Sequence, residues 1–193
     1  MIGIVDYGLG NIRAFENIYK LLEKKIKIIT NPEDFNSVDK IILPGVGSFD
    51  WALEKLDQSG LKDNLIKNVQ DYKKPILGVC VGMQIMATFS EEGNRKGLNW
   101  IPGNVKRFEL SNPQLTPLPQ IGWNQVSMKE NSIGTGLKNS KFYFLHSYYY
   151  SPESSDHIFA KTKYNLEFAS GINKENIFGV QFHPEKSHDN GIR

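Results

Sequence analysis

The sequence has one cysteine, almost no excess charge and no long apolar run, and each of these shortages excludes a class of protein. A single cysteine, Cys80, rules out an internal disulfide and any zinc site built from several thiolates. The formal charge of +2, from 23 basic and 21 acidic residues, is too small to predict binding to nucleic acid or to an anionic membrane. The expected partners are therefore a small molecule and another protein.

The start of the chain shows no targeting segment. Met1–Val5 leads directly to Asp6, without the basic residues and long apolar stretch of a secretory signal. No apolar run approaches the roughly 18 residues that a membrane span needs. These features predict a protein of the reducing cytoplasm, where Cys80 stays a free thiol and is either buried filler or a reagent.

The apolar pattern predicts one α/β domain. In the first half, short apolar runs alternate with amphipathic stretches, which is typical of a parallel sheet flanked by helices. Strands are expected over residues 2–5, 26–29, 41–43 and 76–79. Helices are expected after Asn11, around Trp51–Leu56 and Leu61–Val69, and after residue 80, where Met83, Ile85, Met86 and Phe89 recur. Beyond Glu91, turn residues separate shorter runs at 105–110, 142–150, 157–163 and 177–182, which predicts added antiparallel or mixed strands.

Cys80 lies in the most informative stretch of the chain. The apolar run 76–79 leads straight into Cys80, which has Gly78 and Gly82 two positions to either side, and a helix-like pattern follows. This is the arrangement of a nucleophile elbow, where glycines relieve crowding around a strained, projecting nucleophile. A helix N-terminus beneath the thiol favours its thiolate form. The context therefore favours a reactive cysteine over a buried filler.

His183 is the expected base among the four histidines. It precedes Pro184, which favours extended backbone at His183, and in an extended segment residues i and i+2 share a face. His183 and Glu185 are then expected to point the same way, so that the carboxylate orients the imidazole.

The other three histidines have ordinary explanations. His146 stands in the alternating aromatic run 142–150, which favours a half-buried histidine with satisfied hydrogen bonds. His157 and His188 have polar neighbours and are expected at the solvated surface.

Two glycine-containing loops have different expected roles. Pro44-Gly45-Val46-Gly47 follows a predicted parallel strand, where ligand sites form, and its peptides are candidates to donate an N–H to an oxyanion or to form only a tight turn. Gly8-Leu9-Gly10 is not a dinucleotide fingerprint, because Arg13 occupies the position of the third glycine. We therefore infer no nucleotide cofactor, and no metal site is expected.

The residues from Gly78 to Gln84, with His183-Pro184-Glu185, resemble the class I glutamine amidotransferases. Four further segments are similar to the glutaminase subunits of imidazole glycerol phosphate synthase, over essentially the whole chain: Asp6-Tyr7-Gly8-Leu9-Gly10-Asn11, Pro44-Gly45-Val46-Gly47, Gly122-Trp123-Asn124 and His146-Ser147-Tyr148. The resemblance implies a flavodoxin-like central sheet and a Cys80-His183-Glu185 triad that hydrolyses L-glutamine to glutamate and ammonia.

The resemblance also implies roles for other residues. The N–H of Val81 and a rotated peptide at Gly45 or Val46 would stabilise the oxyanion. Gly47, Gln84, Ser147 and Tyr148 would hold the glutamine. Ammonia would pass to a (β/α)8-barrel cyclase in a heterodimer, which forms imidazole glycerol phosphate and a purine precursor in histidine biosynthesis. The residues that would face or gate this partner are Trp123, Asn124, Tyr143 and Lys186. Without the resemblance, Trp123 and Tyr143 would be interpreted as core aromatics and Lys186 as a solvated charge.

Two departures and two alternatives accompany this interpretation. Val79 and Val81 stand where the family more often has isoleucine and leucine, which conserves shape. The sequence stops at residues 187–193, whereas relatives usually continue into a short amphipathic helix that packs on the sheet, so we expect the single domain 1–193 to lack that last helix. The alternatives are a paralogue that supplies ammonia to a sugar amidotransferase of surface-polysaccharide synthesis, and a non-catalytic binding subunit of the same fold.

Overall fold

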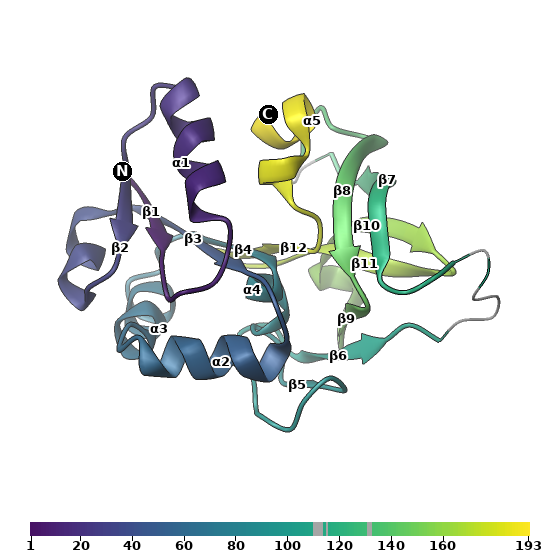
Figure 1. Ribbon diagram of the computed structural model, residues 1–193, viewed down its shortest axis with the longest axis horizontal. Coiled ribbons are helices and arrows are strands. Elements are labelled where there is room, and N and C mark those ends of the chain that lie inside the picture. Colours follow the sequence, from purple (N-terminus) through teal and green to yellow (C-terminus); the bar gives the residue numbers. More distant parts are fainter. Residues whose placement is uncertain (110–113, 115, 131–132) are drawn as a thin grey trace.

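The computed structural model describes residues 1–109, 114, 116–130 and 133–193, and its strands form one mixed sheet (Figure 1). Among the described residues this sheet has 12 strands, with the main order β2-β1-β3-β4-β12-β11-β10-β7-β8, while β5, β6 and β9 form a branch paired to β11. The strands are β1 Ile2–Val5, β2 Ile26–Ile29, β3 Lys40–Gly45, β4 Ile76–Cys80, β5 Phe89–Ser90, β6 Gly103–Arg107, β7 Gln120–Met128, β8 Ser140–His146, β9 Tyr148–Pro152, β10 Ile158–Tyr164, β11 Leu166–Lys174 and β12 Ile177–Val180.

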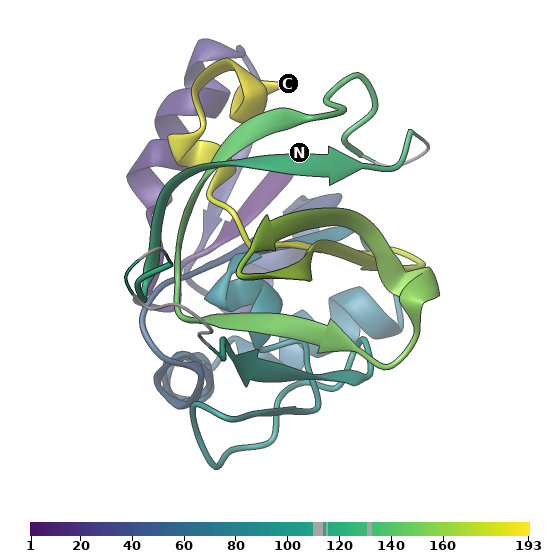
Figure 2. The ribbon, with the colours of Figure 1, turned by 90° about the vertical axis from the view of Figure 1, so that its right-hand side faces the viewer.

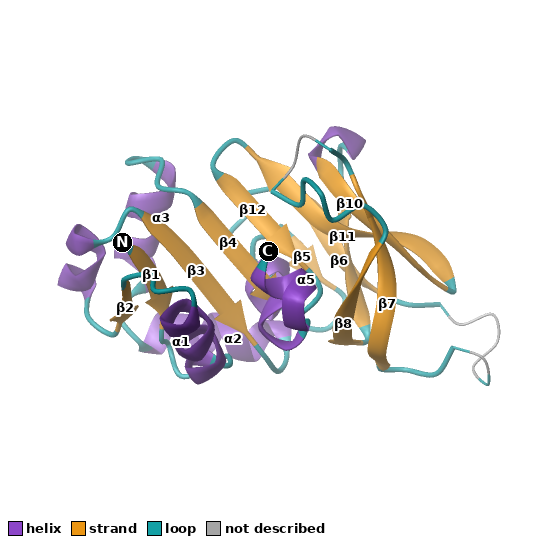
Figure 3. Cartoon of the chain, turned by 90° about the horizontal axis from the view of Figure 1, so that it is seen from above, coloured by secondary structure: helices purple, strands orange, loops and turns teal. Residues whose placement is uncertain are grey.

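Helices cover both faces of the parallel part of the sheet (Figure 3). The helix α1 and the short C-terminal α5 lie on one face, and α2 and α3 lie on the other (Figure 1). The helices are α1 Ile12–Leu21, α2 Phe49–Gln58, α3 Lys62–Gln70, α4 Val81–Gln84 and α5 His188–Ile192, with short 3-10 turns η1 Pro32–Ser37, η2 Ser155–His157 and η3 Pro184–Lys186. No helix within the described ranges is both long and apolar enough to cross a membrane.

The sheet changes character at β12. Strands β2, β1, β3, β4 and β12 are all parallel neighbours, whereas β11, β10, β7 and β8 continue the sheet in antiparallel pairs. Figure 2 views the molecule from this antiparallel end. The predicted α/β class with added antiparallel strands is confirmed, but the addition is a continuation of the same sheet.

The helix expected after Cys80 is much shorter than predicted. It ends at Gln84, and Phe89, expected on its apolar face, is 46% exposed in β5. The carbonyls that would continue the helix accept from another segment instead: Leu98 N–H donates to Ile85 O at 2.8 Å and Trp100 N–H donates to Met86 O at 2.9 Å. Tertiary pairing therefore overrides the local periodicity.

The run 142–150, expected as one strand, is two strands separated at Ser147. The segment before it, β8, pairs with β7, while the segment after it, β9, pairs with β6 and β11.

Strands β7 and β11 were not predicted, and Leu110 of the expected run 105–110 lies outside the described residues. Trp51, expected on the apolar face of α2, is 43% exposed, and Phe49, Ala52, Leu53 and Leu56 face the core instead.

The face of the sheet beside α1 is only partly covered. A cavity of about 520 Å³ lies there, lined by apolar side chains that include Tyr19, Ile41, Leu77 and Phe178. Residues 188–192 form α5, and Arg193, which follows it, contributes to the lining of this cavity.

Candidate active site

Cys80 ends the central strand β4 in a strained conformation. Its φ of 56° and ψ of −114° are rare for a residue with a side chain, and the residue is 4% exposed. A Cβ at Gly82 would lie 2.0 Å from the carbonyl oxygen of Leu43, and one at Gly78 would lie 2.7 Å from Gly82 O. Both glycines are therefore required by close backbone approach, as expected for a nucleophile elbow.

His183 reaches Cys80 because their strands are neighbours. Strands β4 and β12 are parallel with Val79 opposite Val180, so the residues that follow each strand emerge at the same sheet edge. His183 Nδ1 lies 2.8 Å from Glu185 Oε1, and both side chains are at most 3% exposed. The predicted pairing of His183 with Glu185 is present, but the prediction that both residues lie in one extended segment was wrong. Pro184–Lys186 form a 3-10 turn, and only His183 is extended.

The electrostatic surroundings favour the protonated form of His183. Burial opposes the charge, but hydrogen bonds to Cys80 and Glu185, with their negative charges, raise the pKa of His183 to about 9. A protonated imidazole beside the thiol stabilises a thiolate, which is the reactive form of cysteine. The second carboxylate oxygen, Glu185 Oε2, is buried and has no hydrogen-bond partner within the described chain.

Ser187 holds the backbone of His183 in place. Its hydroxyl donates to His183 O at 2.6 Å and accepts from Tyr143 N at 3.0 Å, while His183 N donates to Tyr143 O at 2.9 Å. Ser187 is 1% exposed. Sequence reasoning did not single out this residue, because the nearby strand β8 that it bonds is distant in sequence.

His146 is also part of the site, contrary to the expectation of an ordinary half-buried histidine. It is 6% exposed and lines the same cavity as Cys80. Its Nδ1 lies 2.7 Å from Tyr148 O, and its Nε2 has no partner among the described residues. Burial, together with repulsion from His183, lowers the pKa of His146 to about 4, so it is neutral near pH 7. His183 is therefore the better placed base.

The two remaining histidines differ in surroundings. His188 is exposed, as expected, and its ring stacks on Trp123 with centroids 5.3 Å apart. His157 is half-buried, and its Nδ1 is enclosed without a partner in the described structure, so it is not a fully solvated residue.

A cavity of about 270 Å³ opens beside Cys80. This volume is near the lower end of small-ligand sites. The structure brings all four residues predicted to bind substrate, the triad cysteine and histidine, and two predicted oxyanion residues into its wall. The lining consists of Val46, Gly47, Cys80, Val81, Gln84, Glu92, Pro119, Leu145, His146, Ser147, Tyr148, His183 and Lys186.

The predicted oxyanion loop lies directly against the elbow. Gly45 pairs with Cys80 across β3 and β4, and a Cβ at Gly45 would lie 2.4 Å from the backbone nitrogen of Gly82. Gly47 has a φ of 89°, which favours glycine, and Val46 between them is 38% exposed. The loop therefore has close contact with the nucleophile at one end and conformational freedom at the other.

Glu92 is a cavity residue that sequence reasoning missed. Its Oε2 accepts from Phe49 N at 2.8 Å, at the start of α2, and burial raises its pKa. A carboxylate in this wall complements a cationic group such as the ammonium of an amino acid. Glu92 lies in a turn-rich segment without periodicity, so no sequence signal placed it near Cys80.

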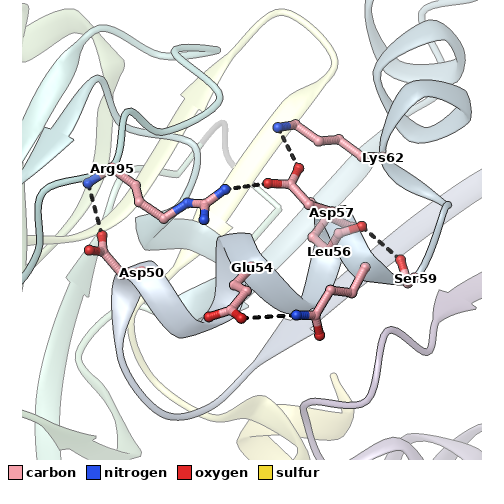
Figure 4. A network of polar contacts seen from close by, with 8 residues as sticks. Asp50, Glu54, Leu56, Asp57, Ser59, Lys62 and Arg95 are labelled. Atoms are coloured by element: carbon pink, nitrogen blue, oxygen red, sulfur yellow. Dashed lines mark hydrogen bonds and ion pairs between the residues drawn. The ribbon is translucent and has the colours of Figure 1, made fainter.

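Asp50 anchors the loop that carries Glu92 (Figure 4). Its two carboxylate oxygens accept from Asn94 N at 2.9 Å and Arg95 N at 3.1 Å, and a Cβ at Gly93 would collide with the same carboxylate. The guanidinium of Arg95 pairs with Asp57, which also accepts from Lys62 at 2.7 Å. The loop is thus fixed to α2 by several charged contacts.

Aromatic and cationic side chains form the outer edge of the site. Trp123 on β7 is 45% exposed and lies edge-on to Tyr143 on β8, with ring centroids 6.4 Å apart. Lys186 Nζ lies 5.7 Å from the Tyr143 ring centroid and also lines the cavity. Trp123 is therefore not a core aromatic. Asn124 is turned towards β10, where its Nδ2 donates to Lys163 O at 3.0 Å.

The fold and the cysteine-centred cavity define a class of enzyme, and the comparisons with known proteins agree with it. The sequence profile of the family "Glutamine amidotransferase class-I" matches residues 3–191. A crystal structure described as a glutamine amidotransferase has the same fold, with a TM-score of 0.77 over 99% of this chain and 94% of that chain, at 16% identity. The chain belongs to the class I glutamine amidotransferase family.

Relatives within the family are much more similar in sequence. The protein from Leptospira interrogans named "Imidazole glycerol phosphate synthase subunit HisH" is 51% identical, with 100% of this chain and 96% of that protein covered. The protein of the same name from Bdellovibrio bacteriovorus is 45% identical with the same coverage.

Proposed function

We propose that this chain is the glutaminase subunit of an imidazole glycerol phosphate synthase and hydrolyses L-glutamine to supply ammonia for histidine biosynthesis. One observation carries the proposal: a strained cysteine at a strand end lies beside a buried His183–Glu185 pair in a cavity of amino-acid size. The full-length similarity to proteins named as HisH subunits supports the choice of pathway.

The proposed reaction begins with attack by the Cys80 thiolate on the carboxamide carbon of glutamine. A carbon–sulfur bond forms, and the carbonyl oxygen takes the negative charge. His183, protonated near pH 7, then gives its proton to the leaving nitrogen as the carbon–nitrogen bond breaks, which releases ammonia and leaves a glutamyl thioester. Water, deprotonated by His183, attacks the thioester carbon and the carbon–sulfur bond breaks, so that glutamate leaves and the Cys80 thiolate and the protonated His183 are restored. Glu185 keeps the imidazole oriented throughout.

The proposed oxyanion donors are the N–H of Val81 at the start of α4 and a rotated peptide at Gly45 or Val46. All three residues lie next to Cys80, two of them in the cavity wall and Gly45 in register with Cys80. Loss of one such donor typically costs about 100- to 1000-fold in rate. The exposed Val46 provides the freedom for this rotation, so we expect the isolated chain to be a poor glutaminase.

Substrate binding is assigned to residues on three sides of the cavity. Gly47 and Gln84 lie towards the parallel part, and Ser147 and Tyr148 lie at the break between β8 and β9. Glu92 adds a carboxylate for the α-ammonium group of glutamine. Both hydrogens of the Gln84 amide already have protein acceptors, so Gln84 offers its oxygen to a substrate N–H.

The proposed partner is a (β/α)8-barrel cyclase that forms a heterodimer with this chain in the cytoplasm. The cluster of the exposed Trp123 and Lys186 with the half-buried Tyr143 at the cavity edge supports an interface here, because tryptophan and tyrosine are enriched at protein contacts. Asn124, the next residue on β7, is also proposed to face the partner, from the side where its amide bonds Lys163 of β10. Ammonia released at Cys80 would leave past this edge.

A reconstitution assay tests the proposal. The chain is mixed with the host's barrel cyclase and its ribulosyl phosphate acceptor, and glutamate release and imidazole glycerol phosphate formation are both measured. Dependence of both products on glutamine and cyclase supports the proposal. Activation only by a sugar-modifying amidotransferase would overturn the pathway in favour of the surface-polysaccharide paralogue. Cyclase binding without glutamate release would favour the non-catalytic subunit.

A further inference from the structure

A chain of buried side-chain amides connects the break between β8 and β9 to the thiol of Cys80. Gln84 Nε2 donates to Tyr148 O at 3.1 Å and to Gln181 Oε1 at 3.0 Å. Gln181 Nε2 in turn lies 3.8 Å from Cys80 Sγ, within the range of a hydrogen bond to sulfur. Gln181 is 0% exposed and Gln84 is 3% exposed, so neither amide exchanges these partners for water.

The orientation of both amides follows from the backbone. Tyr148 O is a carbonyl and only accepts, so the Gln84 group that faces it must be the nitrogen. The second hydrogen of that nitrogen requires an acceptor, which fixes the oxygen of Gln181 towards Gln84. The nitrogen of Gln181 must then face Cys80. The reverse orientation would place two donors together and an oxygen against the sulfur.

Gln181 is rigidly placed for this contact. Its backbone N donates to Ser170 O at 2.9 Å, which continues the pairing of β12 with β11. Gln181 follows β12 and precedes His183 by two residues, and both residues are buried within reach of Cys80. The thiol therefore has the imidazole of His183 and the amide of Gln181 as neighbours from one short segment.

We propose that Gln181 is a further residue of the catalytic centre, which holds the Cys80 thiolate by donating a hydrogen bond to its sulfur, and that Gln84 fixes the orientation of this donor. The inference rests on the proposed function, in which Cys80 is the nucleophile. The bond to a thiolate is stronger than the bond to a neutral thiol, because the acceptor is charged. Gln181 therefore favours the attacking form and keeps the sulfur pointed into the cavity while His183 is free to move its proton.

Gln181 acts among several ionisable groups around the thiol. His183 stabilises the thiolate most directly, and Tyr7, whose hydroxyl is buried and whose pKa is raised by burial and by Cys80, faces it from the loop after β1. The ionisable groups of the described residues that contact Cys80 or line its cavity are Tyr7, Glu92, His146, Tyr148, His183 and Lys186, with Glu185 behind His183. The test must therefore change Gln181 without changing any of these groups.

The experiment measures alkylation of Cys80 by iodoacetamide from pH 5 to 10 in Gln181→Met and Gln181→Glu. Because Cys80 is the only cysteine, the alkylated mass reports this thiol alone. In Gln181→Met we expect alkylation at pH 7 to slow about tenfold and the midpoint of its pH profile to move upwards. Gln181→Glu retains the acceptor for Gln84 but places an oxygen against sulfur, so its midpoint should move further. Unchanged midpoints in both folded variants would overturn the inference.

Gln120→Met is the matched control. Gln120 is a buried carboxamide, 3% exposed, on β7, so the substitution removes the same group from the interior without removing a donor to Cys80. Its alkylation midpoint should equal that of the unmodified chain. A shift as large as that of Gln181→Met would assign the effect to general loosening and would reject the inference.

A measurement on the unmodified chain covers the case in which the Gln181 variants do not fold. The side-chain amide signals of Gln181 in ¹⁵N NMR should shift with pH at the alkylation midpoint of Cys80, and should lose that shift after alkylation. A Gln181 amide that does not respond to the thiol would overturn the inference. Glutamine hydrolysis by Cys80→Ala would instead defeat the proposed function, so the two failures are distinguishable.

Discussion

The cavity beside Cys80 has a buried wall and an exposed rim, and the two are built differently. The buried wall consists of Cys80, Gln84 and His183, with Gln181 and Glu185 behind them, and hydrogen bonds hold these residues in one arrangement. The rim consists of the exposed Val46, Trp123 and Lys186 and the half-buried Tyr143, which ring contacts and loop conformation hold at the cavity edge. We infer from this difference that the wall determines the chemistry and the rim determines when it proceeds.

The largest expected effect is at the centre of the buried wall. Cys80→Ala removes the nucleophile and should reduce glutamine hydrolysis in the cyclase complex by about 10⁴-fold or more. The lost side chain is small, so thermal unfolding and cyclase binding should stay near those of the unmodified chain. Glutamate release is measured together with binding by calorimetry. Turnover close to that of the unmodified complex would remove Cys80 from the mechanism.

Glu185→Gln tests the orientation of the base within the same wall. The amide does not stabilise the imidazolium, so we expect a fall in kcat of about 100-fold or more and a lower pKa for His183.

The same variant changes how stability depends on pH. The folded pKa of His183, about 9, lies above the ordinary value of 6.5, so its stabilisation is complete below about pH 6.5 and is lost as pH rises towards 9. The free energy of unfolding should fall over this window, and Glu185→Gln should reduce that fall. Identical pH profiles from denaturant titrations would contradict the assigned ion pair.

A substitution in the rim should act by weakening binding of the proposed cyclase partner. Trp123→Ala should weaken cyclase binding by about 10- to 30-fold and lower the activity of the complex at limiting cyclase, without reducing the basal glutaminase rate of the isolated chain. Trp51→Ala is the matched control, because Trp51 is 43% exposed against 45% for Trp123 but lies on α2. Equal weakening by both substitutions, measured by calorimetry, would show that the rim has no particular role.

The smallest expected effect is outside both regions. Asp50→Asn weakens the anchor of the loop that carries Glu92, so the KM for glutamine should rise a few-fold, up to about tenfold, with little change in kcat. Glu54→Gln on the same helix is the control, because Glu54 contacts Gln58 and not the loop. Steady-state kinetics in the cyclase complex measure both. A lower kcat with an unchanged KM would mean that the loop does not act through substrate binding.

The parallel part of the molecule was predictable because its signals are local. Apolar runs marked β1, β2, β3 and β4 within a residue or two, and the glycines around Cys80 marked the elbow. The central strands β1, β3 and β4 are mostly buried, so they appear in the sequence as continuous apolar runs.

The remaining parts depend on contacts between distant segments. The end of α4 is set by hydrogen bonds from residues 97–100, and the break at Ser147 is set by a change of strand neighbours. Glu92 enters the cavity through a loop fixed by Asp50. Gln181 is different: its spacing of two residues from His183 was a usable signal, and strand alternation would have placed both on the same side.

The adjacency of β4 and β12 places the reacting groups without the help of the outer antiparallel strands. The strands that end in Cys80 and lead into His183 are hydrogen-bonded neighbours, although almost the whole antiparallel part of the chain lies between them in sequence. That intervening part contributes Trp123 and Tyr143 to the rim. Changes in its outer strands therefore leave the register of Cys80 and His183 unchanged, because the hydrogen bonds between β4 and β12 hold the two strand ends together.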